Sequence, residues 1–323
     1  MNNQLKIAVV GIGGMGVVHI SNYAHIPDSK VTTVCDPAKS GKLKAAEIGA
    51  AHYTDIDEML KNEDIDVVDI CTPSDLHKEQ VLKALGAGKH VICEKPIALC
   101  KADAEEMFSL AHKKGVRLFI AQVLQYAPET IVLRDIIDSG VYGKPLDAVF
   151  LRLAACPRWI KEGWLFDKSK SGLLPFDLHI HDLDLIVSLF GAPETINYTS
   201  CGSSSAEYKE HYRFIYGYKN MSIAAEAAWY NADIPFTATW RVYFENAVVI
   251  NDGTSVTAYR FDHPPLVFDT EEKVKIPTGI NIPPTGIFLA ELSDFVEKIK
   301  QGGSGGDRES EILKVMEILE GIV

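Results

Sequence analysis

The stretch that decides the fold runs from Lys6 to Tyr23 and reads KIAVVGIGGMGVVHISNY. It begins with an apolar, β-branched run that predicts a buried strand, and it ends in a pattern typical of a helix. Between the two stand Gly11, Gly13 and Gly16 in the spacing GxGxxG. Glycine-rich turns are common, but one that joins a strand to a helix predicts a dinucleotide-binding unit.

Each glycine of this turn has its own task in holding a pyrophosphate. Gly11 permits the tight turn, Gly13 lets the backbone approach the phosphates, and Gly16 lets the helix pack closely on the strand. The helix N-terminus adds free N–H groups and a positive dipole end. We therefore expect cofactor contacts along the whole turn, which comprises Gly11, Ile12, Gly13, Gly14, Met15 and Gly16.

The next strand-like run, VTTVCD, ends at Asp36, twenty residues after Gly16. A carboxylate at this position accepts hydrogen bonds from the ribose hydroxyls of an adenosine and repels a 2′-phosphate, so NAD is favoured over NADP. Two observations leave alternatives open. Asp36 and Pro37 together are also a common turn opener, and Lys39 and Lys42 are available to a phosphate.

The remainder of the first half alternates strand-like and helical patterns. The runs VVDICTP, HVICE and RLFIAQV are separated by amphipathic stretches such as LHKEQVLKALGAG. This alternation predicts a doubly wound parallel sheet with helices on both faces. Ligands of such sheets collect at the carboxyl ends of the strands. Further cofactor contacts are therefore expected from the residues that follow two of the strands, namely Thr72, Pro73 and His77, and Glu94, Lys95 and Pro96.

Lys95 is the candidate for chemistry at this edge of the sheet. It follows directly on buried strand residues, so it is expected to project over the nicotinamide end of the cofactor. An ammonium group there can bind a substrate hydroxyl and stabilise a developing alkoxide. The alternative is a surface lysine that is paired with Glu94 at a strand end.

The totals limit the class of protein. A chain of 323 residues is too long for one typical core, and the change of pattern predicts a first domain over residues 1–123 and a second over residues 124–323. A net charge of −12 argues against a nucleic-acid partner. No apolar run approaches the roughly 18 residues of a membrane span, and the start does not have the pattern of a signal peptide. Six cysteines without a CxxC pair indicate reduced thiols and a cytoplasmic protein.

Strand patterns dominate much of the second half. The runs TINYTS, YRFIYGY, SIAAEAAWY and ATWRVYFENAVVI follow one another between Glu194 and Asn251. Successive antiparallel strands predict one large sheet, with a face free for helices or a partner subunit. The run QGGSGGD, from Gln301 to Asp307, predicts a flexible connection before a last amphipathic helix.

A dense set of titratable groups lies in FDLHIHDLD, from Phe176 to Asp184. Breakers on both sides of the segment and an apolar face predict a helix that starts near Phe176. Such a helix places Asp177, His181, Asp184 and Ser188 on one stripe. His179 and Asp182 lie on a different side.

Three interpretations of this stretch compete. A metal site is disfavoured, and no metal is expected, because His179 and His181 are two residues apart and diverge by about 160° on a helix. A solvated polar face fits Asp182 above all. In the third interpretation Asp177 holds the tautomer of His181, whose other ring nitrogen faces a substrate hydroxyl as general base.

Four segments together carry a family resemblance. GIGGMG, CTPSDLH, AGKHVICEKPIAL and SGLLPFDLHIHDLD occur in the order of the Gfo/Idh/MocA oxidoreductases, and the chain resembles glucose–fructose oxidoreductase and inositol 2-dehydrogenase. The resemblance implies an N-terminal Rossmann domain and a C-terminal α/β domain with a large, mostly antiparallel open sheet. It also implies a homodimer or homotetramer, and Lys95, Asp177 and His181 as the catalytic set.

The implied reaction passes a hydride between a secondary alcohol of a sugar, cyclitol or related polyol and a nicotinamide cofactor. The chain departs from the family at Gln125, where a basic residue is frequent, and at His179, where glycine is frequent. The run CPRWIKEGWLFD adds Arg158, Trp159 and Trp164, whose aromatic faces and donor suit a polyol, although packing is an equal alternative.

Two other functions remain open at this point. A non-catalytic NAD-binding sensor or regulator would share the fold, but it has no need for the set of Lys95, Asp177 and His181. An NAD-dependent enzyme that cleaves glycosides through transient oxidation would share these residues, and only its products would distinguish it.

Overall fold

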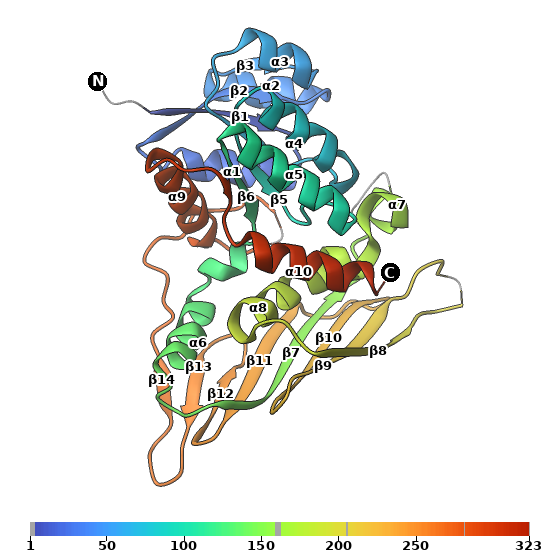
Figure 1. Ribbon diagram of the computed structural model, residues 1–323, viewed down its shortest axis with the longest axis vertical. Helices are drawn as coiled ribbons and strands as arrows, with labels where there is room; N and C mark the ends of the chain where they lie inside the picture. The colour runs from blue at the N-terminus through green and yellow to red at the C-terminus, as the bar shows by residue number, and fades with distance from the viewer. Residues whose placement is uncertain (1–3, 159–162, 205, 281, 323) are drawn as a thin grey trace. The chain divides into compact units, whose positions relative to one another are not determined.

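The computed structural model describes residues 4–158, 163–204, 206–280 and 282–322 (Figure 1). The chain forms two compact units. The first comprises Met1–Tyr126 and Glu272–Met316, and the second comprises Ala127–Glu271 and Glu317–Val323. The predicted domains were two consecutive segments. The structure differs because residues 272–316 return to the first unit and complete its core and its sheet.

The first unit is built on a parallel sheet, which has seven strands among the described residues. Its order is β15-β6-β5-β4-β1-β2-β3. The strands are β1 (Leu5–Val10), β2 (Ser29–Cys35), β3 (Ala51–Tyr53), β4 (Val67–Ile70), β5 (His90–Glu94), β6 (Arg117–Ala121) and β15 (Gly305–Gly306). The chain winds one way from β1 to β3 and the other way from β4 to β6. The switch point, where such folds bind ligands, lies between β1 and β4.

Helices cover both faces of this sheet, as Figure 1 shows. They are α1 (Gly14–Tyr23), α2 (Lys39–Ile48), α3 (Ile56–Asn62), α4 (His77–Gly86), α5 (Lys101–Lys114) and α9 (Ile287–Lys300), with the short turns η1 (Ser74–Leu76) and η2 (Val123–Tyr126). The last helix, α10 (Glu309–Glu320), begins in the first unit and runs past the division at residue 316. The predicted doubly wound architecture is confirmed.

Helix α9 explains why a late segment belongs to the first unit. Its apolar residues, among them Leu292 and Phe295, are buried in one core with Ile7 and Phe119 of the sheet. The rings of Phe119 and Phe295 stack with their centroids 4.6 Å apart. Removing this apolar surface from water stabilises the unit by about 25 cal/mol for each Å².

The predicted flexible connection from Gln301 to Asp307 is wrong for Gly305 and Gly306. Gly305 and Gly306 form β15 and pair with β6. A Cβ atom at Gly305 would lie 2.0 Å from the ring of His112, and one at Gly306 would lie 2.2 Å from the ring of Phe108. These glycines therefore permit close packing of the backbone against α5, a use of glycine that composition does not distinguish from a linker.

The second unit is built on a sheet with eight strands among the described residues, in the order β14-β13-β12-β11-β7-β10-β9-β8. The strands are β7 (Pro145–Ala155), β8 (Thr195–Cys201), β9 (His211–Gly217), β10 (Ser222–Tyr230), β11 (Thr237–Phe244), β12 (Ala247–Asn251), β13 (Val256–Tyr259) and β14 (Leu266–Phe268). Neighbours are antiparallel except β7 and β10, which are parallel. The large, mostly antiparallel open sheet is confirmed.

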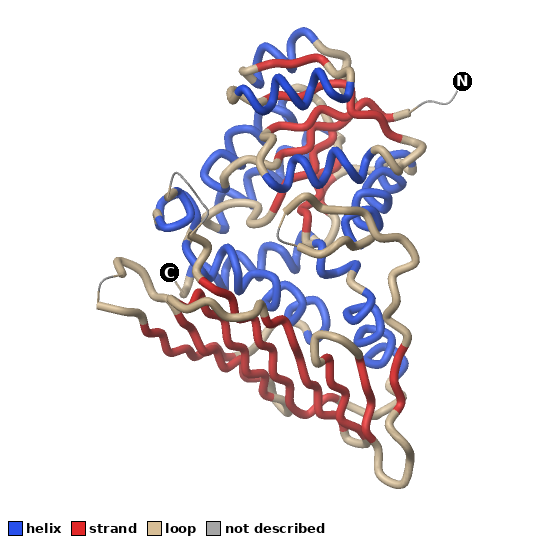
Figure 2. The backbone as a smooth tube through the Cα atoms, turned by 180° about the vertical axis from the view of Figure 1, so that it is seen from behind, coloured by secondary structure: helices blue, strands red, loops and turns tan. Residues whose placement is uncertain are grey.

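Helices lie on one face of this second sheet (Figures 1 and 2). They are α6 (Pro128–Ser139), α7 (Lys168–Ser171) and α8 (Ile180–Phe190), with the turns η3 (Trp164–Phe166) and η4 (Pro175–His179). Strand β9 shows the consequence for its side chains. Phe214 and Tyr216 are buried, whereas Arg213 and Ile215 between them are exposed. One face of the sheet carries the core and the other is open.

No helix among the described residues is both long and apolar enough to cross a membrane.

Candidate active site

The glycine turn has the features that a bound pyrophosphate requires. Gly11 has a φ of +85°, and a Cβ atom there would lie 2.7 Å from Cγ2 of Thr72. A Cβ atom at Gly16 would lie 2.0 Å from the carbonyl oxygen of Gly11, whereas one at Gly13 would meet nothing within 4 Å. The turn is thus closed where strand and helix pack and open at Gly13, where the predicted phosphates approach. Helix α1 begins next to this opening without a side-chain cap.

Asp36 is oriented by the same turn. Its carboxylate accepts hydrogen bonds from the backbone N–H groups of Ile12, at 2.6 Å, and Ala38, at 2.7 Å. A Cβ atom at Gly41 would lie 2.5 Å from Cβ of Asp36. Each carboxylate oxygen has two lone pairs, so the group retains acceptor capacity for ribose hydroxyls. The predicted contact with ribose remains a prediction.

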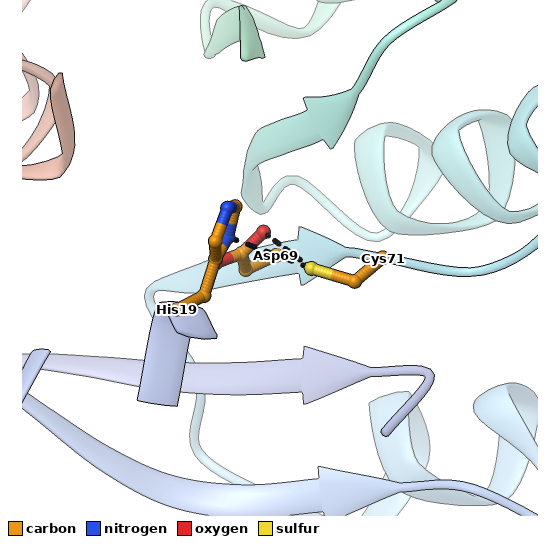
Figure 3. A group of neighbouring side chains, drawn as sticks. All are labelled: His19, Asp69 and Cys71. Carbon is orange, nitrogen blue, oxygen red and sulfur yellow. Dashed lines mark hydrogen bonds and ion pairs between the residues drawn. The ribbon is translucent and has the colours of Figure 1, made fainter. Parts of the chain in front are cut away.

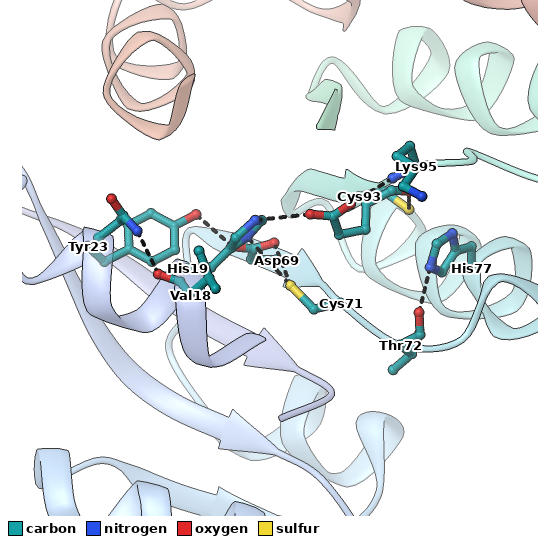
Figure 4. Close-up of polar contacts among 11 residues, drawn as sticks. Val18, His19, Tyr23, Asp69, Cys71, Thr72, His77, Cys93 and Lys95 are labelled. Atoms are coloured by element: carbon teal, nitrogen blue, oxygen red, sulfur yellow. Dashed lines mark hydrogen bonds and ion pairs between the residues drawn. The ribbon is translucent and has the colours of Figure 1, made fainter. Parts of the chain in front are cut away.

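The side chain of His77 contacts the backbone of two segments that are predicted to bind the cofactor. Its Nε2 lies 2.9 Å from the carbonyl oxygen of Thr72 (Figure 4). Its Nδ1 lies 2.8 Å from the carbonyl oxygen of Pro96. Burial lowers the pKa of His77, so the ring is neutral and donates to one carbonyl at a time. Both nitrogens face the backbone, which gives His77 a structural task that the sequence did not reveal.

Lys95 follows β5 directly and is half-buried. Its backbone N–H donates to Oε2 of Glu94 at 3.1 Å, and the side chain of Glu94 is itself buried. Gln125 lies in η2, shortly after the end of the neighbouring strand β6. The structure therefore brings the glycine turn, Asp36, Thr72, Pro73, Glu94, Lys95, Pro96 and Gln125 to the carboxyl ends of parallel strands in one unit.

A buried polar cluster behind Glu94 was not predicted. It consists of His19 on α1, Asp69 on β4 and Cys71 after β4 (Figure 3). Nδ1 of His19 lies 2.8 Å from Oδ2 of Asp69, and Sγ of Cys71 lies 3.5 Å from each of these side chains. The available signal was one aspartate inside the apolar run VVDIC, a polar residue that a buried strand accepts only with a partner.

The charge state of His19 follows from two opposed effects. Burial acts to lower the pKa of His19, but the charge of the Asp69 carboxylate raises it, and the net result is a pKa well above the usual value. We therefore describe His19 as an imidazolium inside the protein core. Burial raises the pKa of the Cys71 thiol, which keeps its proton.

The stretch in the second unit begins with a π-helical turn, η4, in which the N–H of Ile180 donates to the carbonyl oxygen of Pro175. The helix predicted to start near Phe176 is thus present, but its first turn is wider than expected. Turns of this kind are frequent at functional sites. Asp177 lies within the π-turn and His181 in the first turn of α8, and both are half-buried.

His179 and Asp182 fasten this segment to the sheet. The ring of His179 stacks on that of Phe214 with their centroids 3.9 Å apart, and its Nε2 lies 2.6 Å from the hydroxyl of Tyr216. Asp182 accepts two hydrogen bonds from Arg152, at 2.8 and 3.0 Å. The predicted solvated position of Asp182 is wrong: it is buried, because the guanidinium compensates its charge.

The remaining predicted substrate residues lie in the loop after β7. Arg158 is exposed and donates to Oδ1 of Asn231. It lines a cavity of about 430 Å³ together with Phe166 and Tyr208, whose rings stack at 5.2 Å. Trp164 is half-buried at the start of η3, and Trp159 lies outside the described residues. Phe166 and Tyr208 are the aromatic residues that line this cavity, and neither was predicted from the sequence.

Two family models match consecutive parts of the chain. One, described as oxidoreductase family with an NAD-binding Rossmann fold, matches residues 5–122. The other, described as the GFO/IDH/MocA C-terminal domain, matches residues 131–261. Together they cover most of the chain, which therefore belongs to the Gfo/Idh/MocA oxidoreductase family, and the resemblance noted in the sequence is confirmed.

Two curated relatives with named activities match over shorter segments. The 2,7-anhydro-N-acetylneuraminate hydratase of Escherichia coli (strain K12) is 31% identical over 195 residues, which are 60% of this chain and 52% of the relative. The D-glucoside 3-dehydrogenase of the same organism is 34% identical over 198 residues, 59% of this chain and 56% of the relative. The chain thus spans about half the length of these relatives.

A solved structure extends the similarity to the whole chain. Levoglucosan dehydrogenase, in complex with NADH and levoglucosan, superimposes with a TM-score of 0.85 over 99% of this chain and 96% of that one. The two sequences are 21% identical. At this identity the comparison shows a shared fold and leaves the substrate open.

Proposed function

We propose that this member of the Gfo/Idh/MocA family is an NAD-dependent dehydrogenase that acts on a secondary alcohol of a sugar, cyclitol or related polyol. The observation that carries the proposal is a juxtaposition within the first unit. A glycine turn that is open at Gly13 follows β1, at the switch point of the sheet, and Lys95 follows β5 at the same edge. A cofactor cradle and a cationic side chain at one sheet edge suit hydride transfer from an alcohol.

The residues fit a nicotinamide dinucleotide. The space at Gly13 and the uncapped start of α1 suit the pyrophosphate, and Asp36 suits an unphosphorylated ribose, which favours NAD over NADP. When bound, the nicotinamide ring supplies the acceptor for the hydride of the alcohol carbon.

The chain's own residues move the proton in this proposal. Asp177 holds the His181 imidazole in one tautomer, and the other ring nitrogen takes the proton as the O–H bond of the alcohol breaks. The role proposed for Lys95 is that its Nζ donates a hydrogen bond to the alcohol oxygen of a bound substrate and stabilises the negative charge that forms there. These roles rest on the family resemblance of the EKP and DLHIH motifs.

The first experiment tests the activity. The purified protein is mixed with NAD and a panel of inositols, hexoses, pentoses, aminosugars and sugar acids, and NADH is followed at 340 nm. NADH formed with a panel member supports a dehydrogenase. If NAD binds by calorimetry and no member reduces it, the proposal is replaced by a non-catalytic NAD-binding sensor.

A Lys95→Ala variant tests the assignment of Lys95. We expect turnover to fall about 100- to 1000-fold or more, because the developing alkoxide loses its hydrogen-bond donor. The dissociation constant for NAD should change by less than about threefold. A matched control is Lys61→Ala, which removes an exposed lysine of α3. Turnover of the Lys95 variant equal to that of the control would remove Lys95 from the mechanism.

An Asp36→Ala variant tests the choice of cofactor. We expect the preference for NAD over NADP to fall about tenfold or more, since the repulsion of a 2′-phosphate and the acceptor for the ribose are both lost. The affinities for both cofactors are measured by calorimetry. An unchanged ratio would show that Asp36 does not face the ribose.

A second candidate function is cleavage of a glycoside through transient oxidation. It is favoured by one observation: a relative named as a hydratase, a reaction without net oxidation, is nearly as similar as the dehydrogenase relative. Product analysis separates the two candidates. Net NADH supports the dehydrogenase, and a released aglycone without net NADH supports the cleaving enzyme.

We also propose that the chain forms a homodimer or homotetramer through the open face of the second sheet. Strands β9, β11 and β13 carry the large side chains Ile215, Tyr243 and Tyr259, each 45–47% exposed. Exposed apolar side chains of this size are typical of interfaces. Light scattering of the wild type and of an Ile215→Lys variant tests this, and a monomeric wild type would contradict it.

A further inference from the structure

A chain of buried polar contacts leads from the core of the first unit to Lys95 (Figure 4). Oδ2 of Asp69 lies 2.8 Å from Nδ1 of His19. Nε2 on the other side of that ring lies 3.2 Å from Oε1 of Glu94, within ion-pair distance although without hydrogen-bond geometry. The second oxygen of Glu94 accepts the backbone N–H of Lys95 at 3.1 Å. Three elements, α1, β4 and β5, are connected in this way.

Stability alone does not account for this arrangement. His19 and Asp69 are fully buried, and Glu94 is nearly so. Removing such groups from water costs several kcal/mol for each ion, and apolar residues of similar volume are commonly as stable. The chain of contacts therefore calls for a task other than holding helix and sheet together.

A metal site does not explain the cluster. His19, Asp69 and Cys71 each offer an atom that could bind an ion. Two ligands at about 2.0–2.1 Å from one tetrahedral zinc would be about 3.3 Å apart. Nδ1 and Oδ2 are 2.8 Å apart, which is a hydrogen-bond distance, and the thiol keeps its proton.

We propose that His19 is a positioning residue for Lys95. In this inference, which rests on the proposed function of Lys95, the ring of His19 fixes one carboxylate oxygen of Glu94, and the other oxygen then fixes the backbone at Lys95. Asp69 sets the orientation of the ring. Lys95 can thereby present its ammonium group in one place, and misplacement of a catalytic group by about 1 Å is enough to slow turnover about 100-fold.

The charge balance agrees with this role. The raised pKa of His19 leaves a cation between the carboxylates of Asp69 and Glu94. Two further groups face Asp69, the hydroxyl of Tyr23 at 2.9 Å and the thiol of Cys71. Tyr23 thus binds the same carboxylate as His19 but does not lie on the path from His19 to Lys95, which makes it a matched control.

The test compares His19→Gln with Tyr23→Phe. Each removes polar contacts to Asp69 from the same part of the core, so both are expected to lower the melting temperature. For the panel alcohol that is oxidised fastest, we expect His19→Gln to lower kcat at least tenfold, with less than threefold change in KM and in the NAD dissociation constant. Tyr23→Phe should keep kcat within twofold. A kcat within twofold of wild type in His19→Gln, or an equal loss in both variants, would overturn the proposal.

A double variant tests the path through Glu94. If His19 acts through Glu94, the combination of His19→Gln with Glu94→Gln should be little slower than the slower single variant. Independent defects would instead multiply. If His19→Gln does not fold, Glu94→Gln alone tests the path, because it leaves the imidazole and Asp69 in place. We expect Glu94→Gln also to lower kcat at least tenfold. A Glu94→Gln kcat within twofold of wild type would contradict the path.

Failure of the proposed function is distinguishable from failure of this inference. If Lys95→Ala retains turnover, the role of Lys95 fails. If Lys95→Ala is inactive and His19→Gln is normal, only the inference fails. If no panel alcohol is oxidised, labelling of Lys95 by pyridoxal 5′-phosphate, trapped with borohydride and quantified by mass spectrometry, is the readout. His19→Gln should change the labelling rate of Lys95 at least threefold and leave that of exposed Lys61 unchanged. An unchanged rate at Lys95 would overturn the inference.

Discussion

The two units each contain a fully buried histidine, and the two residues differ in every property except burial. His19 lies against Asp69, which raises its pKa, so it carries a charge. His179 stacks on Phe214, and burial together with Arg152 lowers its pKa to about 3, so it is neutral. Burial opposes the charged form in both cases. The neighbouring side chains therefore decide whether a buried histidine is charged or neutral.

The two histidines also differ in the role that their contacts indicate. The charged histidine connects through Glu94 to the segment of Lys95. The neutral histidine fastens α8 to β9 next to Asp177 and His181, but its own nitrogen faces Tyr216. The ring of His179 packs against the sheet, and its contacts indicate a structural role.

The largest expected effect comes from replacing Asp69, the carboxylate that raises the pKa of His19 and has no counterpart at His179. Asp69→Asn leaves His19 in the core without a counter-charge on that side. We expect the free energy of unfolding of the first unit to fall by about 3–5 kcal/mol, the usual cost of leaving one partner of a buried ion pair. Urea denaturation measures the loss. Hydrogen exchange of peptides from α1 and β4 should show it there, whereas peptides from α8 and β9 are the internal control.

The pH dependence of stability should have opposite signs at the two histidines. The pKa of His179 falls from its usual 6.5 to about 3 on folding. Below pH 6.5 the unfolded chain binds a proton that the folded unit does not, so stability is lost as the pH falls, by about 1 kcal/mol for each pH unit. Replacement of His179 by Gln should flatten this slope in hydrogen exchange of α8 and β9 between pH 6.5 and 4.

His19 provides the matched opposite case. Because its pKa is raised on folding, its contribution to stability is complete below about pH 6.5 and is lost as the pH rises through the folded value. Peptides from α1 should therefore lose protection at alkaline pH and not in the acid range that affects α8. The same acid slope in both peptides would contradict the assignment of the two charge states.

The smallest expected effect concerns Tyr23, which donates to Asp69 at 2.9 Å. Tyr23→Phe removes one buried hydrogen bond and keeps the ring, so the free energy of unfolding should fall by about 1 kcal/mol. Thermal and urea denaturation measure the change. A loss as large as that of Asp69→Asn would mean that the hydroxyl, and not the histidine, is the main partner of the carboxylate.

The sequence predicted those structural elements whose conformation is determined by residues close together in the chain. The glycine turn, the strand that ends at Asp36 and the helix after Phe176 each carry their own signal of spacing and polarity. The pairing of His19 with Asp69 could not be predicted, because the two residues are fifty positions apart. The sequence showed only that each is a polar residue within an apolar run. The strand at Gly305 was missed for a related reason: its partner, β6, is nearly two hundred residues earlier.

The pairing of β15 with β6 has a consequence for how the protein is made. The first sheet gains its edge strand, and the core gains α9, only after residues 127–271 of the second unit have been synthesised. At 5–20 residues per second, a ribosome needs about 10–40 s to add the residues between Tyr126 and Gly306. During that interval the nascent nucleotide-binding half exposes an open strand and an apolar surface, features that attract chaperones and promote aggregation. Nucleotide binding by the nascent chain should therefore mature late, after the segment that closes the sheet has left the ribosome.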